Sequence, residues 1–219
     1  MASPPVAEFS LLETMRLEDG RLIREAGHLA RMGTAADQCG FTWDQHRVAR
    51  ALAEVAGAHP TGRWRVRLLL SPAGEPTAEC TLMPQPSERP WRIGFAAHPV
   101  DETDPFLRIK TTRRQVYEAA RAARPDLDDV LLWTPAGTIT ESTIGNLVAE
   151  IDRVRCTPPA TLPLLPGVFR ADLVASGALV ERVLQREDVA RASRLWLVNS
   201  LREWIDVELE RGDDVSVSL

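Results

Sequence analysis

The sequence predicts a mixed fold with α+β and α/β character, divided into two lobes. Strand-like and helix-like hydrophobic patterns alternate along the chain, whose 219 residues suffice for one large domain or two small lobes. A polar segment with turn residues and a proline, residues 98–104, separates these patterns into two groups. We therefore expect a small α/β N-terminal lobe over residues 1–97, a linker over 98–104 and a larger α/β C-terminal lobe over 105–219.

The elements of the first lobe follow from hydrophobic spacing and from the residues that end each pattern. Residues 63–70 alternate and then become fully apolar, as a strand that enters a core does. Apolar residues recur at helical spacing from Leu29 to Cys39, and Gly40 ends that helix. The expected elements are strands over 9–16, 63–70, 77–82 and 91–96, helices over 29–39 and 43–56, a turn over 18–21 and a proline-rich connection over 84–90.

The second lobe shows the same mixture. A helical pattern over 111–123 is ended by Pro125, and two apolar runs joined by the turn 134–137 predict a hairpin. A glycine turn at 164–170 opens a further helix that reaches about Ser176. The expected strands are 129–133, 138–140, 146–151, 195–198 and 205–209.

Composition and charge exclude several classes of protein. The net charge of −5, with arginines interleaved among acids, argues against nucleic-acid binding, which needs a basic face. The three cysteines are widely spaced with no CxxC pair, which indicates free thiols in a reducing compartment and no metal site. The start of the chain has no signal-peptide pattern, and no apolar run approaches the roughly 18 residues that cross a bilayer. We expect a cytoplasmic protein with no nucleic-acid or membrane partner.

Lysine occurs once, at Lys110, against 25 arginines. Arginine stays protonated at any pH a protein meets, whereas a desolvated lysine can lose its proton and become a nucleophile. The single lysine is either a surface remnant of codon bias or a residue whose work arginine cannot do. The residues that surround Lys110 in the fold distinguish these two interpretations.

Four further segments carry side chains suited to a site. Arg31 lies among apolar residues of the first helix, and Glu141 directly follows the hairpin. Gly167 opens a helix whose backbone N–H groups suit a phosphate. Asn199 and Ser200 place polar groups at the end of an apolar strand.

Each of these residues also has a plain structural alternative. Arg31 could pair with Asp37 or Glu25, Glu141 could cap a turn, and Gly167 could simply end a loop. Together, however, they are the parts of a pyridoxal phosphate (PLP) site. Such a site needs a lysine for the Schiff base, a carboxylate for the pyridine nitrogen, and an arginine, a helix start and a hydroxyl for the phosphate.

The order and the amino-acid sequences of these segments resemble those of the fold type IV PLP enzymes. This superfamily includes branched-chain and D-amino-acid transaminases and 4-amino-4-deoxychorismate lyase. The resemblance runs from about residue 9 to residue 209. Within the superfamily, Lys-Thr-Thr-Arg-Arg and Val-Asn-Ser-Leu-Arg-Glu-Trp are most similar to aminodeoxychorismate lyases, especially those fused behind a chorismate-using synthase. The segments that carry the resemblance are Leu12–Arg16, His28–Arg31, Lys110–Thr112, Thr140–Thr143 with Asn146, Thr157–Pro159, Leu165–Val168 with Arg170, and Asn199–Ser200.

The resemblance implies a two-lobe PLP-dependent fold of type IV, similar to D-amino-acid aminotransferase, and a role for each matching residue. Lys110 would be the catalytic Schiff-base lysine that binds the cofactor and then acts as general base. Glu141 would bind the pyridine nitrogen and Arg31 the phosphate. Further cofactor-binding roles fall to the backbone N–H groups of Val168 and Phe169, the Ser200 hydroxyl, and Asn146 in support. Weaker substrate-binding candidates are Arg113, Arg202, Asn199 and Thr14, and no metal is implied.

The reaction that the resemblance implies is elimination of pyruvate from 4-amino-4-deoxychorismate to give 4-aminobenzoate, in folate synthesis or a specialised pathway. The alternative is a class IV aminotransferase of the branched-chain or D-amino-acid type. A third, less favoured reading is a non-catalytic partner of a chorismate-using synthase. A small-molecule substrate, a homodimer and a functional link to an aminodeoxychorismate synthase follow from the resemblance as well.

Three departures from the family pattern bear on these expectations. The chain begins late relative to the family, without its usual first strand. Phe169 replaces a small hydroxyl residue of the transaminases, so one phosphate contact is lost or supplied elsewhere. Arg113 stands where several relatives have a small polar residue, and it either contacts a substrate carboxylate or faces outward from a helix.

Overall fold

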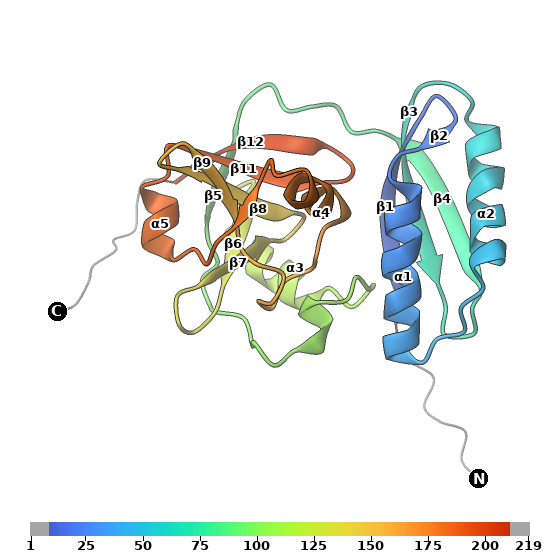
Figure 1. Cartoon of the computed structure of the whole chain (residues 1–219), viewed down its shortest axis with the longest axis horizontal. Coiled ribbons are helices and arrows are strands. Elements are labelled where there is room, and N and C mark those ends of the chain that lie inside the picture. Colours follow the sequence, from blue (N-terminus) through green and yellow to red (C-terminus); the bar gives the residue numbers. More distant parts are fainter. Residues whose placement is uncertain (1–8, 211–219) are drawn as a thin grey trace, which may run out of the picture. The chain divides into compact units, whose positions relative to one another are not determined.

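The computed structural model describes residues 9–210 of the chain (Figure 1). These residues form two compact units, each with its own sheet. The first unit comprises residues 9–85 and Phe106–Arg114, and the second comprises Pro86–Pro105 and residues 115–210. The expected mixed α/β fold is confirmed.

The division into units differs from a single cut at residues 98–104. Strand β5 (Trp91–Phe95), expected in the first lobe, belongs to the second unit because it pairs in parallel with two strands there. Lys110, expected in the second lobe, belongs to the first unit because backbone hydrogen bonds join its segment to the first strand. The short 3-10 helix Pro105–Leu107 lies where the chain returns to the first unit.

The first unit is an antiparallel sheet with two helices. The strand order is β2-β1-β3-β4, and every pair is antiparallel. Helix α1 ends at Gly40, whose φ of 68° lies in the left-handed region that favours glycine. The elements are β1 (Leu11–Glu18), β2 (Arg21–Leu22), α1 (Glu25–Cys39), α2 (Gln45–Ala58), β3 (Arg63–Leu70) and β4 (Pro76–Leu82).

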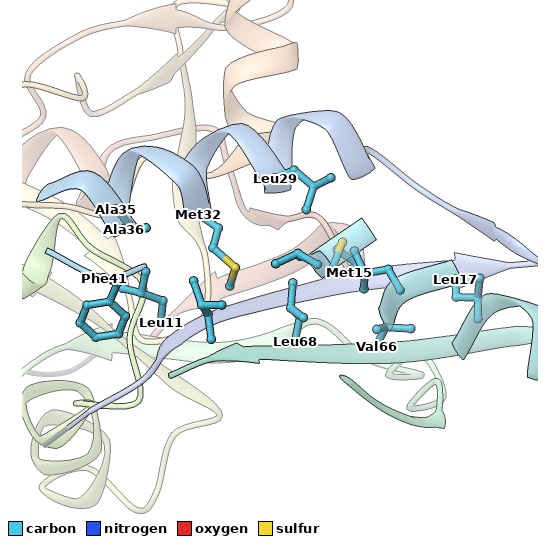
Figure 2. Packing of buried hydrophobic residues seen from close by; sticks show 13 residues of the cluster. Leu11, Met15, Leu17, Leu29, Met32, Ala35, Ala36, Phe41, Val66 and Leu68 are labelled. Carbon is cyan, nitrogen blue, oxygen red and sulfur yellow. The ribbon is translucent and has the colours of Figure 1, made fainter. Parts of the chain in front are cut away.

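Both helices of this unit cover the same face of the sheet. Alternate residues of β1 point toward α1, as Figure 2 shows for Met15 beneath Met32 and Leu29. The other face of β1 carries Leu12, Thr14, Arg16 and Glu18. The buried cluster consists of Leu11, Met15, Leu17, Leu29, Met32, Ala35, Ala36, Phe41, Val48, Leu52, Val66, Leu68 and Leu70.

The second unit is built on a mixed sheet of eight strands in the order β10-β9-β8-β11-β12-β5-β6-β7. The expected hairpin is present, since β6 pairs antiparallel with β7. The elements are β5, α3 (Gln115–Ala122), β6 (Asp129–Trp133), β7 (Ile139–Ser142), β8 (Asn146–Ile151), β9 (Val154–Thr157), α4 (Val168–Ala175), β10 (Val180–Glu181), α5 (Arg186–Ala190), β11 (Arg194–Asn199) and β12 (Glu203–Leu209).

Side chains on both faces of this sheet are buried. On β8, Leu147 and Ala149 belong to one apolar cluster, whereas Val148 points to the other face and packs with Phe169 of α4. Asn146 shares the face of Val148, because strand residues alternate between the two faces. Helix α4 therefore lies on the side of the sheet that carries Asn146.

Two expectations about elements need correction. The helix expected over 111–123 begins only at Gln115, because residues 110–112 are extended and bonded to β1. Short elements that carry little hydrophobic pattern, namely β2, β9, β10 and α5, were not predicted. No helix within residues 9–210 is long and apolar enough to cross a membrane.

Candidate functional site

Lys110 lies on a short extended segment at the edge of β1. The N–H of Leu12 donates to the Lys110 carbonyl at 2.9 Å, and the N–H of Thr112 donates to the Ser10 carbonyl at 2.9 Å. The Thr112 hydroxyl accepts from the N–H of Ser10 at 3.0 Å. The lysine side chain is half-buried. The backbone at Lys110 is therefore fixed by hydrogen bonds, and its amine extends from this fixed point, as a covalent catalyst requires.

Arg31 forms a bidentate ion pair with Glu13 of β1. Its Nε donates to Glu13 Oε1 at 2.8 Å, and its Nη2 donates to Oε2 at 2.6 Å. His28, one helical turn before Arg31, places Nδ1 at 2.7 Å from the same Oε2. Arg31 thus pairs with Glu13, a residue that the sequence did not suggest as its partner.

The Glu13 carboxylate is 1% exposed, on the face of β1 that otherwise carries Leu11, Met15 and Leu17. Burial raises its pKa, but the charge of Arg31 and the hydrogen bonds from His28 and Arg31 outweigh this and lower the pKa to about 2. Glu13 is therefore an anion at neutral pH, held inside an apolar core by its two partners.

Glu141 lies on β7 and is 3% exposed. Its Oε1 accepts from the Tyr117 hydroxyl at 2.9 Å and from the Leu165 N–H at 3.0 Å. Tyr117 comes from α3 and is the one tyrosine in the chain. Two donors hold this oxygen in place and limit the movement of the carboxylate, as a precise hydrogen bond to a ring nitrogen requires.

Asn146 supports the turn that opens α4. Its Nδ2 donates to the Leu165 carbonyl at 2.9 Å, while the N–H of Leu165 donates to Glu141. The Leu165 backbone is thus held from both sides. Gly167, the residue before α4, approaches Asn146 so closely that an added Cβ would lie 2.2 Å from Asn146 Oδ1.

Replacing Gly167 by alanine is expected to lower the free energy of unfolding by about 2–3 kcal/mol, because the new methyl group overpacks the turn. Asn146 would have to move, and its hydrogen bond to Leu165 would be lost. Thermal unfolding of the purified variant measures this, with an expected fall in Tm of about 5–10 °C for a chain of this size.

Gly57→Ala is the matched control for that substitution. Gly57 lies within α2, and an added Cβ there meets no heavy atom within 4 Å. Alanine should leave stability unchanged or raise it slightly, because it is the better helix former. An unchanged Tm in Gly167→Ala would contradict the close contact with Asn146.

The first turn of α4 and the end of β11 lie together in the second unit. Val168 and Phe169 begin the helix, and Gly167 provides no side-chain cap for their N–H groups. The Phe169 ring packs with Val198 and lies edge-on to Trp204 at 6.3 Å, which explains an aromatic residue here. Ser200, 7% exposed, follows the end of β11. A helix start and a hydroxyl are the donors a phosphate needs.

Asp129, at the start of β6, fixes the turn that follows Glu141. It is 1% exposed, and its Oδ1 accepts from the Thr143 hydroxyl at 2.5 Å and from the Val130 N–H at 2.8 Å. Burial raises the pKa of Asp129, against the opposing effect of these hydrogen bonds. Its Oδ2 is buried without a hydrogen-bond partner among the described residues, so ionisation is costly.

We expect Asp129 to reduce stability as the pH rises. A carboxyl whose pKa is higher in the folded state contributes its full stability below the unfolded value, 3.8, and loses it as the pH rises through the folded pKa. Asp129→Asn removes this loss, so the variant should gain stability relative to the parent with increasing pH. Chemical denaturation between about pH 4 and about pH 8 measures the difference.

Asp126→Asn is the control for the pH series. Asp126 is exposed, and its hydrogen bond from Arg124 lowers its pKa, so its removal should not reproduce that slope. A difference between Asp129→Asn and the parent that did not change with pH would contradict the assignment.

The weaker candidates for substrate binding each contact residues that can be named. Arg113 precedes α3 instead of lying on it, and its guanidinium lies 4.4 Å from the Phe106 ring. Arg202 lies 5.4 Å from the Trp91 ring. Asn199 Oδ1 accepts from the N–H groups of Leu201 at 3.0 Å and Arg202 at 2.8 Å, which makes the segment a fixed turn.

Thr14 lies on the face of the first sheet opposite the helices, where arginines gather. It pairs with Arg67 across the β1–β3 ladder, and Arg16 pairs with Arg65. Arg63 and Arg16 both contact Glu18 at the end of this face. The result is a cationic sheet surface that was not identified from the sequence, although the Arg-x-Arg-x-Arg alternation on β3 was its signal.

The structure therefore divides the expected residues between the two units. Lys110 and Arg31 are held by neighbouring residues of β1, and Thr14 and Arg113 belong to the same unit. Two residues in contact with candidates were not predicted, Glu13 and Tyr117. Asp129 was not predicted either, and it contacts Thr143 in the turn after Glu141. The remaining candidates, Glu141, Asn146, Val168, Phe169, Asn199, Ser200 and Arg202, belong to the second unit.

Comparison with known proteins places this geometry in context. The family model described as "Amino-transferase class IV" matches residues 10–209. A Schizosaccharomyces pombe protein provisionally named an aminodeoxychorismate lyase is 30% identical over 205 residues, which cover 90% of this chain and 87% of that protein.

Solved structures resemble the chain over a similar length. A provisionally named amino-acid aminotransferase from Mesorhizobium loti is 36% identical with a TM-score of 0.86, and the match covers 93% of this chain and 100% of that one. The PLP-bound form of a hypothetical aminotransferase from Mycobacterium tuberculosis is 24% identical with a TM-score of 0.78, covering 92% of this chain and 81% of that one.

Proposed function

The chain belongs to the amino-transferase class IV family, whose fold depends on PLP, and from this premise we propose that it eliminates pyruvate from 4-amino-4-deoxychorismate to give 4-aminobenzoate. The similarity to the Schizosaccharomyces pombe protein named for this activity supports the proposal. So do the Lys-Thr-Thr-Arg-Arg and Asn-Ser-Leu-Arg segments, which are most similar to the lyases.

The residues present fit PLP by their chemistry. When bound, PLP supplies an electron sink that stabilises negative charge on the carbon that bears the substrate amine. Lys110 is the only side-chain amine that could attach it covalently. Glu141, a buried carboxylate with two fixed donors, would hold the ring nitrogen protonated. Arg31, Ser200 and the first N–H groups of α4 would bind the phosphate.

In the proposed reaction Lys110 acts as the base. Its amine would take the proton from the amine-bearing ring carbon of the substrate. The electron pair left behind would form the new ring double bond as the carbon–oxygen bond to the enolpyruvyl group breaks. The leaving oxygen would depart as the enolate of pyruvate, which takes up a proton. Aromatisation of the ring would make the step effectively irreversible.

The turn after β11 is the observation that favours a lyase over an aminotransferase. Asn199 uses its side-chain oxygen to accept from two backbone N–H groups, and its Nδ2 donates to the Ile144 carbonyl at 3.3 Å. A glycine or serine, as in the transaminase segments, could not form all three bonds. The arginine-rich face around Thr14 would also suit a substrate with two carboxylates.

A class IV aminotransferase is the second candidate, favoured by the 36% identity to the Mesorhizobium loti protein of that name. The PLP-loaded protein should be incubated with enzymatically generated aminodeoxychorismate, and in parallel with amino donors and keto acids. The lyase proposal expects stoichiometric 4-aminobenzoate and pyruvate in the first reaction. Full turnover in the second reaction, with no pyruvate in the first, would refute it. The homodimer and the link to a synthase stay predictions.

A further inference from the structure

We propose that Glu13 is a positioning residue for the cofactor phosphate, acting through Arg31. The inference rests on the proposed function only in so far as Arg31 binds that phosphate. The choice between lyase and aminotransferase does not enter, because both would hold the same cofactor.

The burial of Glu13 is the first observation. A carboxylate that is 1% exposed, on a strand face otherwise occupied by leucine and methionine, costs desolvation energy that an apolar residue would not. Its neighbours Leu11 and Met15 pack normally in the cluster around α1 (Figure 2). Core stability therefore does not explain an acid at this position.

The geometry of the ion pair is the second observation. Both carboxylate oxygens of Glu13 accept hydrogen bonds from the Nε–Nη2 edge of Arg31, which fixes the plane of the guanidinium. His28 contacts the same carboxylate and restrains its rotation. A guanidinium whose plane is fixed in this way can bind an anion with little further loss of side-chain entropy.

The position of the pair on β1 is the third observation. Leu12, the residue before Glu13, donates its N–H to the Lys110 carbonyl at 2.9 Å. Adjacent residues of one strand thus hold the lysine backbone and the arginine head group. Since strand residues are rigidly spaced, this arrangement fixes the distance between the attachment point of the cofactor and its phosphate anchor.

The test compares binding of PLP with binding of pyridoxal, which has the same aldehyde and ring but no phosphate. Each ligand is titrated into apoprotein and followed by the absorption of the bound chromophore. Lys110 is the only lysine, so covalent trapping by borohydride and mass spectrometry confirms the site. Glu13→Gln should weaken PLP binding about tenfold or more and change pyridoxal binding less than about twofold.

Glu18→Gln is the matched control. Glu18 lies on the same strand and pairs with Arg63 at 2.7 Å, away from Arg31. It should leave both affinities unchanged. Glu13→Asp keeps the charge but shortens the reach, and it should show the same selective loss in smaller degree, which maintains the test if Glu13→Gln does not fold.

A double-variant cycle tests whether Glu13 acts through Arg31. Combining Glu13→Gln with Arg31→Gln should weaken PLP binding no more than Arg31→Gln alone. Additive losses, equal losses for PLP and pyridoxal, or unchanged PLP binding in Glu13→Gln would each overturn the proposal. Equal affinities of the parent protein for PLP and pyridoxal would overturn it too, whatever the turnover assays show.

Discussion

Lys110→Arg is expected to abolish covalent attachment of PLP and to reduce turnover by at least about 1,000-fold. Arginine preserves the positive charge but holds its proton too tightly to act as a nucleophile or a base. The backbone bonds from Leu12 and to Ser10 do not involve the side chain, so the variant should fold normally. Borohydride trapping, absorption spectra and product analysis measure the three effects.

The double variant Arg108→Lys with Lys110→Arg is a stringent control, because it keeps the amino-acid composition of the parent. It moves the amine by two residues, from the segment bonded to β1 to an exposed position. Activity should not return. If Lys110→Arg alone kept normal activity, the assignment of the lysine would fail.

Glu141→Gln is the second substitution with a large expected effect, a fall in turnover of about 100-fold or more. The amide keeps an oxygen that can accept from Tyr117 and Leu165, so the local structure should survive. It has no negative charge to keep a ring nitrogen protonated. Steady-state product formation and the spectrum of bound PLP report the change.

Glu150→Gln serves as its control, because Glu150 is a carboxylate of β8, the next strand along the chain, and pairs with Ser193 and Arg155. That variant should retain the turnover of the parent. A Glu141→Gln variant with undiminished turnover would show that the ring nitrogen does not depend on this carboxylate.

The sequence predicted those features that depend on local pattern. Strands 63–70 and 146–151 have the expected bounds, because their hydrophobic runs are clear and their ends are marked by polar or turn residues. The lone lysine and the motif order identified the family and its cofactor, which the comparisons confirm.

Other features depend on contacts between distant segments, which a single sequence does not display. Glu13 was visible within a motif, but its partnership with Arg31 requires β1 to lie beneath α1. Tyr117 meets Glu141 only because α3 packs beside β6, the strand that pairs with β7. The start of α3 at Gln115 was mistaken because pairing with β1 overrides helical propensity at Thr111 and Thr112.

The segment bonded to β1 also has a consequence for how the protein is made. Ser10 and Thr112 are joined across 102 residues, so the ribosome must synthesise half the chain before the first sheet gains its last extended piece. A nascent chain that ended at Gln85 would contain both helices and all four strands of that sheet but no lysine. The lysine attributed to the first unit is therefore synthesised only after β5 of the second unit has already been made.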